Sequence, residues 1–100
     1  MKLSEAIREG AKLRPQCTSG EYFDLDGTSC AMGAAFEAET GHTNLSNDRL
    51  EHAFPELARP TKKPINYGTS GSLEYAIARL NDEYKWTREQ IADWVEEQGY

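Results

Sequence analysis

The stretch that decides the fold is residues 72–95, SLEYAIARLNDEYKWTREQIADWV. Its apolar residues recur at intervals of three and four, the spacing of one face of an α-helix. They are Leu73, Ala76, Ile77, Leu80 and Tyr84 in the first half, and Ile91, Trp94 and Val95 in the second. Between the halves, Thr87 and Gln90 have the spacing of a capping box, preceded by Trp86 as a hydrophobic staple to Ile91. The stretch predicts two helices joined by a short turn, as a helical hairpin or a helix-turn-helix.

The N-terminal third predicts two more helices. The first has Leu3, Ile7 and Leu13 on its apolar side, Ser4 as candidate N-cap, and an end near Arg14 because Pro15 follows. The second is the small-residue run from Cys30 to Glu39, capped by Thr28 or Ser29 and stopped by Gly41. Its many small side chains predict close backbone packing against a neighbouring element.

The middle of the chain predicts one short helix between two loops. The helix spans Asn47 to Phe54 and is stopped by Pro55, and residues 58–71 form an irregular loop. Residues 21–25 alternate weakly between polar and apolar before Asp26-Gly27, a turn signal that allows a short hairpin. We therefore expect a mainly α fold, a small single-domain bundle of about five helices over residues 1–100, with room for one short β-hairpin near residues 21–29.

Composition and charge exclude several classes of protein. The chain has 100 residues, of which 38% are hydrophobic and 28% charged, so it is expected to fold. Its net charge of −6 disfavours nucleic acid and anionic lipid, which attract a basic surface. No apolar stretch is long enough to span a bilayer and no secretory signal is visible, so we expect a cytoplasmic protein with reduced Cys17 and Cys30.

Several short motifs fail on their context. Residues 24–28, DLDGT, match the Asp-x-Asp-Gly-Thr signature of haloacid-dehalogenase-type phosphatases, but no buried strand precedes them, so we expect a turn. The isolated cysteines and histidines lack zinc spacing, and we expect neither metal nor cofactor. Residues 68–72, GTSGS, lack the lysine of a phosphate-binding loop and are expected to cap a helix. A DNA-reading role for the last helix is disfavoured by its acidic residues.

Cys30 is the strongest candidate for chemistry. At the first turn of a helix, the macrodipole would lower the pKa of its thiol. His42 or His52 could then serve as a base, with Asp24, Asp26 or Asp82 as the orienting carboxylate. Free cysteine is also among the most buried residue types, and we favour a structural Cys30 over a reactive one.

Two blocks of sequence carry a family resemblance. Residues 30–35, CAMGAA, and residues 80–96, LNDEYKWTREQIADWVE, together resemble a set of small bacterial and phage-borne proteins. That set carries a Cys-x-Leu-Gly-Ala element and then an Asn-Asp element before a final helix. No established activity comes with the resemblance.

The resemblance directs attention to Asn81 and Asp82. Their side chains could accept hydrogen bonds from the free amides at the start of the Cys30 helix, in which case Asp82→Ala would cost about 1–2 kcal/mol. Alternatively, Asn81 and Asp82 line a small pocket with Cys30. We favour the structural alternative.

We expect a small acidic accessory protein, of phage origin, that acts as a non-enzymatic interaction module. Its partner is expected to be another protein, with Asn81, Asp82 and Trp86 as the binding residues. The alternative is a cysteine-dependent enzyme or redox sensor that uses Cys30. The sequence leaves the oligomeric state open.

Overall fold

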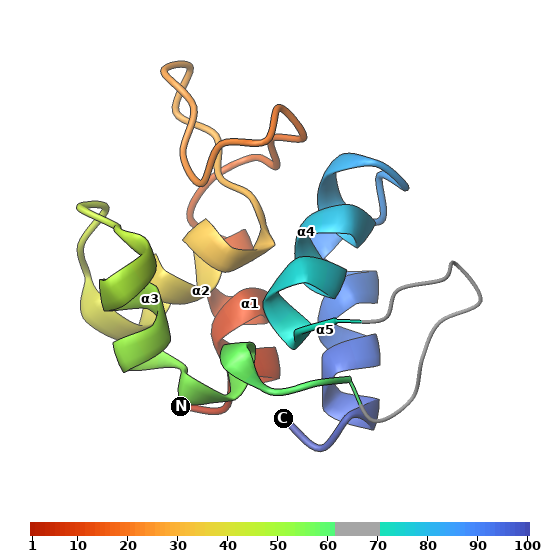
Figure 1. The fold of residues 1–100 in the computed structure, drawn as a ribbon. Helices are drawn as coiled ribbons and strands as arrows, with labels where there is room; N and C mark the ends of the chain where they lie inside the picture. Colours follow the sequence, from red (N-terminus) through yellow and green to blue (C-terminus); the bar gives the residue numbers. More distant parts are fainter. Residues whose placement is uncertain (62–70) are drawn as a thin grey trace.

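Helices α1 (Leu3–Ala11) and α2 (Ala31–Thr40) cross at the centre of the fold, and the other helices pack around them (Figure 1). The computed structural model describes residues 1–61 and 71–100. Helix α1 lies between α2 and α5 (Arg88–Glu97) and has its most extensive contacts with these two. Helix α4 (Leu73–Asp82) packs against α2 and α5. Helix α3 (Asn47–Ala53) packs against the side of α2 away from α5, and the short 3-10 helix η1 (Pro55–Ala58) contacts α3 and α4.

The crossing of α1 and α2 depends on a glycine. A Cβ atom built on Gly10 would lie 1.9 Å from the carbonyl oxygen of Ala34, so only glycine allows the two backbones to approach this closely. Ala34, Ala35 and Ala6 are fully buried around this contact region. The close backbone packing predicted for the small-residue helix is confirmed.

The predicted mainly α fold of about five helices is confirmed, with corrections at the helix ends. Helix α1 ends at Ala11, before the predicted end at Arg14, which leaves Leu13 57% exposed. Ser4 is not the N-cap: Lys2 holds that position without a side-chain cap. The helix starts one residue before Ser4, so the Ser4 hydroxyl is buried and has no hydrogen-bond partner in the described part of the chain.

Helix α2 is capped by a different residue from those predicted. Cys30 is the N-cap, because Thr28 and Ser29 use their hydroxyls elsewhere. The Thr28 hydroxyl donates to Asp26 Oδ1 at 2.6 Å, and the Ser29 hydroxyl accepts from the Arg88 guanidinium at 2.9 Å. At the other end, Gly41 adopts the predicted left-handed C-cap, with φ of 74°.

The C-terminal helical hairpin forms as predicted, except at its turn. Thr87 and Gln90 make both hydrogen bonds of the capping box of α5. Helix α4 ends at Asp82, however, and the chain reverses through Lys85, whose φ is 54°. Tyr84 therefore lies beyond the apolar face of α4 and is 37% exposed.

The long connection between α1 and α2 contains no extended hairpin. Within residues 1–61 and 71–100, β-pairing is limited to isolated bridges, which join Ser29 to Gln16 and to Phe23, and Pro60 to Ser72. The expected turn at residues 24–28 is present, since the Gly27 amide donates to the Asp24 carbonyl. The proposed capping loop at residues 68–72 lies mostly outside the described residues. None of the helices in the described ranges is long and apolar enough to cross a bilayer.

Candidate functional site: a cavity beside the start of α2

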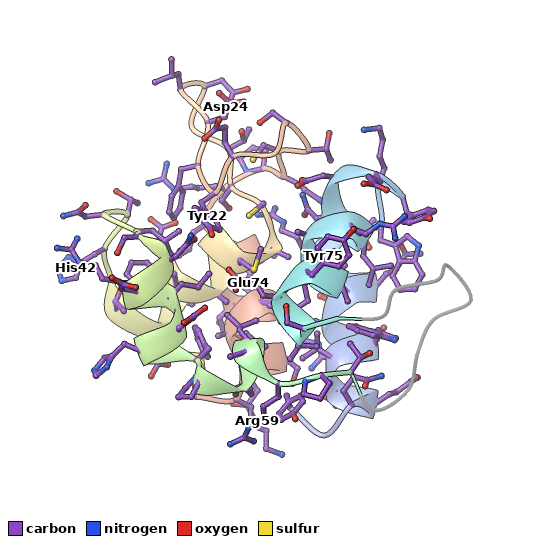
Figure 2. All side chains as sticks on the ribbon, viewed as in Figure 1. Tyr22, Asp24, His42, Arg59, Glu74 and Tyr75 are labelled. Carbon is purple, nitrogen blue, oxygen red and sulfur yellow. The ribbon has the colours of Figure 1, made fainter. Side chains whose placement is uncertain are left out.

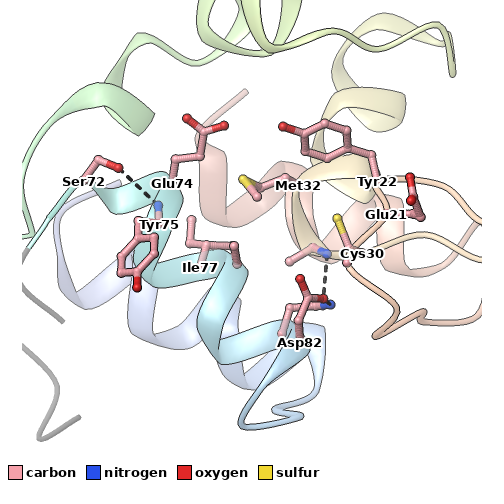
Figure 3. A pocket seen from close by; sticks show the side chains of 13 residues that line it. Glu21, Tyr22, Cys30, Met32, Ser72, Glu74, Tyr75, Ile77 and Asp82 are labelled. Carbon is pink, nitrogen blue, oxygen red and sulfur yellow. Dashed lines mark hydrogen bonds between the residues drawn. The ribbon is translucent and has the colours of Figure 1, made fainter. Parts of the chain in front are cut away.

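A cavity of about 420 Å³ lies between α4 and the start of α2 (Figure 3). One wall is formed by residues of α4 and its N-cap, from Ser72 to Asp82, and the other by residues 20–22 and 30–32. Its apolar lining includes Met32, Ile77 and Ala78. A volume of this size is within the usual range of small ligand sites.

Cys30 lines this cavity but is almost fully buried, with 4% of its surface exposed. Its Sγ accepts a hydrogen bond from the Gly33 amide at 3.4 Å. Burial raises the pKa of the Cys30 thiol to about 11, which outweighs the lowering effect of the Gly33 and Met32 amides at the helix start. The lowered thiol pKa of the reactive alternative is therefore absent, because desolvation of the thiolate dominates, and the burial is that of the favoured structural Cys30.

The histidines considered as bases for Cys30 lie at a different site. His42 and His52 line a second cavity, of about 560 Å³, together with Phe36 and Arg49. Figure 2 shows His42 at the outer edge of the molecule, whereas Tyr22 and Glu74 lie near its centre. Asp24 lies far out on the loop between α1 and α2, and its side chain accepts from the Leu25 amide. Of the proposed partners, only Asp82 shares a cavity with Cys30.

Behind the cavity, Asn81 joins α4 to the start of α2. Its Oδ1 accepts from the Ala31 amide at 3.2 Å and from Gln16 Nε2 at 2.8 Å. Its Nδ2 donates to the Cys17 carbonyl at 2.8 Å and to Asp82 Oδ1 at 2.7 Å. Asn81 thus makes the contact with an α2 amide that the sequence suggested for both residues, while the Asp82 carboxylate bonds to Asn81 itself. Asn81 and Asp82 also line the cavity with Cys30, so the two alternatives for this region coexist.

Arg88 on α5 adds further hydrogen bonds beside the start of α2. It is 7% exposed and donates to the carbonyls of Ala11, Arg14 and Ser29, at 3.3, 2.6 and 3.3 Å. Burial lowers the pKa of its guanidinium from the ordinary value. We call Gln16, Ser29, Asn81 and Arg88 the α2 junction.

The opening of the cavity carries three carboxylates, from Glu21, Glu74 and Asp82, which we call the cavity rim. None of the described lining residues is a lysine, arginine or histidine. No ion pair joins a rim carboxylate to a basic group within residues 1–61 and 71–100. The cavity rim therefore brings three carboxylates together without an ion pair among the described residues, although the Lys85 ammonium donates to the Asp82 carbonyl at 3.2 Å.

Glu74 has the most perturbed environment of the three. Its carboxylate and the Tyr22 side chain point toward one another above Met32 (Figure 3). Burial raises the pKa of Glu74, the nearby Glu51 carboxylate raises it further, and the Tyr22 hydroxyl partly offsets both. Burial also raises the pKa of Tyr22, followed by the charge of Glu74. The Tyr22 hydroxyl carries a single proton, and in this structure it donates to Asn47 Oδ1.

Trp86 is separated from the other two predicted binding residues. It is partly buried, packs against the core, and lines a smaller cavity of about 250 Å³ with Gln90 and Trp94. Conversely, sequence reasoning missed Tyr22 and Glu74. Glu74 could have been found, because it precedes Ala78 and Asp82 at successive intervals of four residues on one face of the helix. Tyr22 lies in a loop without periodicity and gave no such signal.

No group of three or more histidine, cysteine, aspartate or glutamate side chains in the described ranges could hold a metal ion. Compared with protein-family models, curated proteins and solved structures, the chain has no match in any of the three.

Proposed function

We propose that this protein is a non-enzymatic interaction module that docks another protein at the cavity between α4 and the start of α2. The observation that carries the proposal is the cavity rim, where three carboxylates surround an apolar floor without a basic residue among the described lining. Such a surface is complementary to a basic segment of a partner, whose charge would be attracted and whose aliphatic carbons would cover the floor.

The state of Cys30 supports binding over catalysis. A nucleophilic cysteine needs a stabilised thiolate and access to its substrate. Cys30 instead has 4% of its surface exposed and a thiol pKa raised to about 11. The two histidines line the other cavity, so neither is placed with Cys30 around one space.

Alkylation of Cys30 tests the enzymatic alternative. In a Cys17→Ser variant, iodoacetamide should label Cys30 at pH 7 far more slowly in the folded protein than in denaturant, because burial shields the thiol and raises its pKa to about 11. The Cys30→Ser variant, which retains Cys17, controls for labelling at the other thiol. Rapid labelling of folded Cys30 at neutral pH would favour the cysteine-dependent enzyme or sensor.

Peptide selection tests the docking surface. A library of displayed random peptides is selected on the immobilised protein, and the enriched peptides are then measured against a Glu74→Gln, Asp82→Asn double variant. We expect basic peptides that bind the wild type and lose affinity for the double variant. Glu5→Gln is the matched control, since Glu5 is an exposed carboxylate on α1 that lines no cavity described above. Enriched peptides that bind the double variant equally well would contradict the proposal.

A further inference from the structure

The cavity rim has two separate acidic ends. Glu74 and Asp82 are eight residues apart on α4 and both line the cavity. At the α-helical rise, their backbone positions are separated by about 12 Å. Figure 3 shows Glu74 opposite Tyr22 at one end, and Asp82 beside Cys30 at the other. A single ammonium group pairs with carboxylates within about 4 Å, so one cation does not serve both ends.

The space between the two ends is apolar. Ile77 and Ala78 from α4 face Met32 from α2 across it. The methylene groups of a lysine side chain cover such a surface while the ammonium group remains at the rim. The cavity therefore fits two cations joined by a chain that is partly apolar.

Of the basic residues in and just after α4, Lys85 donates to the Asp82 carbonyl at 3.2 Å, whereas Arg79 is occupied elsewhere. Arg79 is paired with Glu83, with 3.1 Å between Nη2 and Oε2, and is not among the lining residues. Its guanidinium lies 5.8 and 5.5 Å from the ring centres of Tyr75 and Tyr84. The Arg79 guanidinium therefore interacts with Glu83, Tyr75 and Tyr84 and not with the cavity rim.

We infer that the occupant of the cavity is an extended, dibasic segment of the partner protein, with two lysine or arginine residues four positions apart. In an extended chain, residues four apart point to the same side and are separated by about 13 Å, which matches the two ends of the rim. One basic side chain then pairs with Glu74 beside Tyr22, and the other with Asp82. This inference rests on the proposed function and specifies what the docking surface recognises.

Short synthetic peptides test the spacing. The peptide acetyl-Lys-Thr-Val-Thr-Lys-amide is titrated into the labelled protein and followed by NMR chemical shifts, beside versions with one lysine replaced by serine and a version with adjacent lysines. We expect the four-spaced dibasic peptide to bind about tenfold more tightly than either monobasic peptide at low salt. Glu74→Gln or Asp82→Asn alone should reduce its affinity to the monobasic level, whereas Glu5→Gln should not. Both substitutions preserve side-chain shape, and the amide spectrum reports whether each variant is folded.

The outcomes separate this inference from the proposed function. Equal affinity for monobasic and dibasic peptides, while selected peptides still depend on the cavity rim, would overturn the dibasic inference alone. Absence of any rim-dependent peptide binding would overturn both. Spermidine, whose amines have a similar span, is the small-molecule control: if it binds as tightly as the dibasic peptide, the occupant is a polyamine and the inference fails. It also fails if sedimentation shows a dimer that the double variant loses, because the occupant is then a second copy of the chain.

Discussion

The α2 junction and the cavity rim both include residues of α4, but they differ in how their polar side chains are paired. In the junction, Asn81 uses both ends of its amide, and Arg88 is held by three backbone carbonyls. At the rim, Glu74 has no basic partner among the described residues, and the pKa of its carboxyl is raised. Satisfied buried polar groups hold a structure together, whereas an unpaired half-buried carboxylate costs stability. The difference separates the residues that maintain the fold from those available to a partner.

The largest of these expected effects comes from a substitution at Gly33, where the first turn of α2 packs against the backbone of Tyr22. A Cβ atom there would lie 2.2 Å from the Tyr22 carbonyl oxygen, which already accepts the Cys30 amide and therefore has little freedom to retreat. We expect Gly33→Ala to lower the free energy of unfolding by about 3 kcal/mol or more, measured by urea denaturation. Gly41→Ala is the control at the other end of α2, where the space is open and only the positive φ opposes alanine, at a cost of about 1 kcal/mol. A smaller loss for Gly33→Ala than for Gly41→Ala would contradict this assignment.

The next-largest expected effect is a difference in stability loss between substitutions at Asn81 and Asp82, two adjacent residues of α4. Asn81→Ala leaves the Ala31 amide and the Cys17 carbonyl without their partner, and we expect a loss of about 2–4 kcal/mol. Asp82→Ala removes only the contact with Asn81 from the described network and should cost about 0.5 kcal/mol, less than the sequence suggested. Thermal unfolding of the two variants under the same conditions compares them. Equal losses would mean that junction and rim are one structural unit.

The smallest expected effect has the opposite sign. The pKa of Glu74 is raised in the folded protein, so the folded state binds the proton more tightly and gains stability as the pH falls through this pKa. Above it, the ionised carboxylate is destabilising. Glu74→Gln should therefore stabilise the protein at pH 7, by no more than about 0.5 kcal/mol because solvent screens the charge, and the gain should vanish below about pH 4. Melting curves across this pH range would measure it, and a variant less stable than wild type at pH 7 would indicate that Glu74 is structural.

The helices were predictable because their signals are local. The three- and four-residue spacing of residues 73–80 and the capping box at Thr87 depend on near neighbours alone, and both are present in the structure. The errors occur where tertiary contacts decide. Ser29 could have capped α2 from its sequence position, but Arg88 on α5 takes its hydroxyl, and Cys30 becomes the cap.

The candidate site was predictable in part for the same reason. Cys30, Asn81 and Asp82 line one cavity, as in the alternative that the sequence left open, and Asn81 also makes the favoured structural contact with α2. Trp86, the third predicted binding residue, lines a different cavity beyond the turn that follows α4. Tyr22 could not be found from sequence, because its position follows from the bridges of Ser29 to Gln16 and Phe23 in a loop without periodicity. The favoured structural Cys30 is buried, and this burial outweighs the helix-start effect on which the reactive alternative depended.

The environment of Arg88 has a consequence for how the chain unfolds. Its guanidinium donates hydrogen bonds to carbonyl oxygens at the end of α1, in the loop after α1 and at Ser29. It thereby links separate segments, as a bound structural metal ion does in other small domains. This internal cation ties α5 to segments 59 or more residues earlier in the chain. The first and last helices should therefore open as one cooperative unit, with amides of α1 and α5 exchanging with solvent at matching rates.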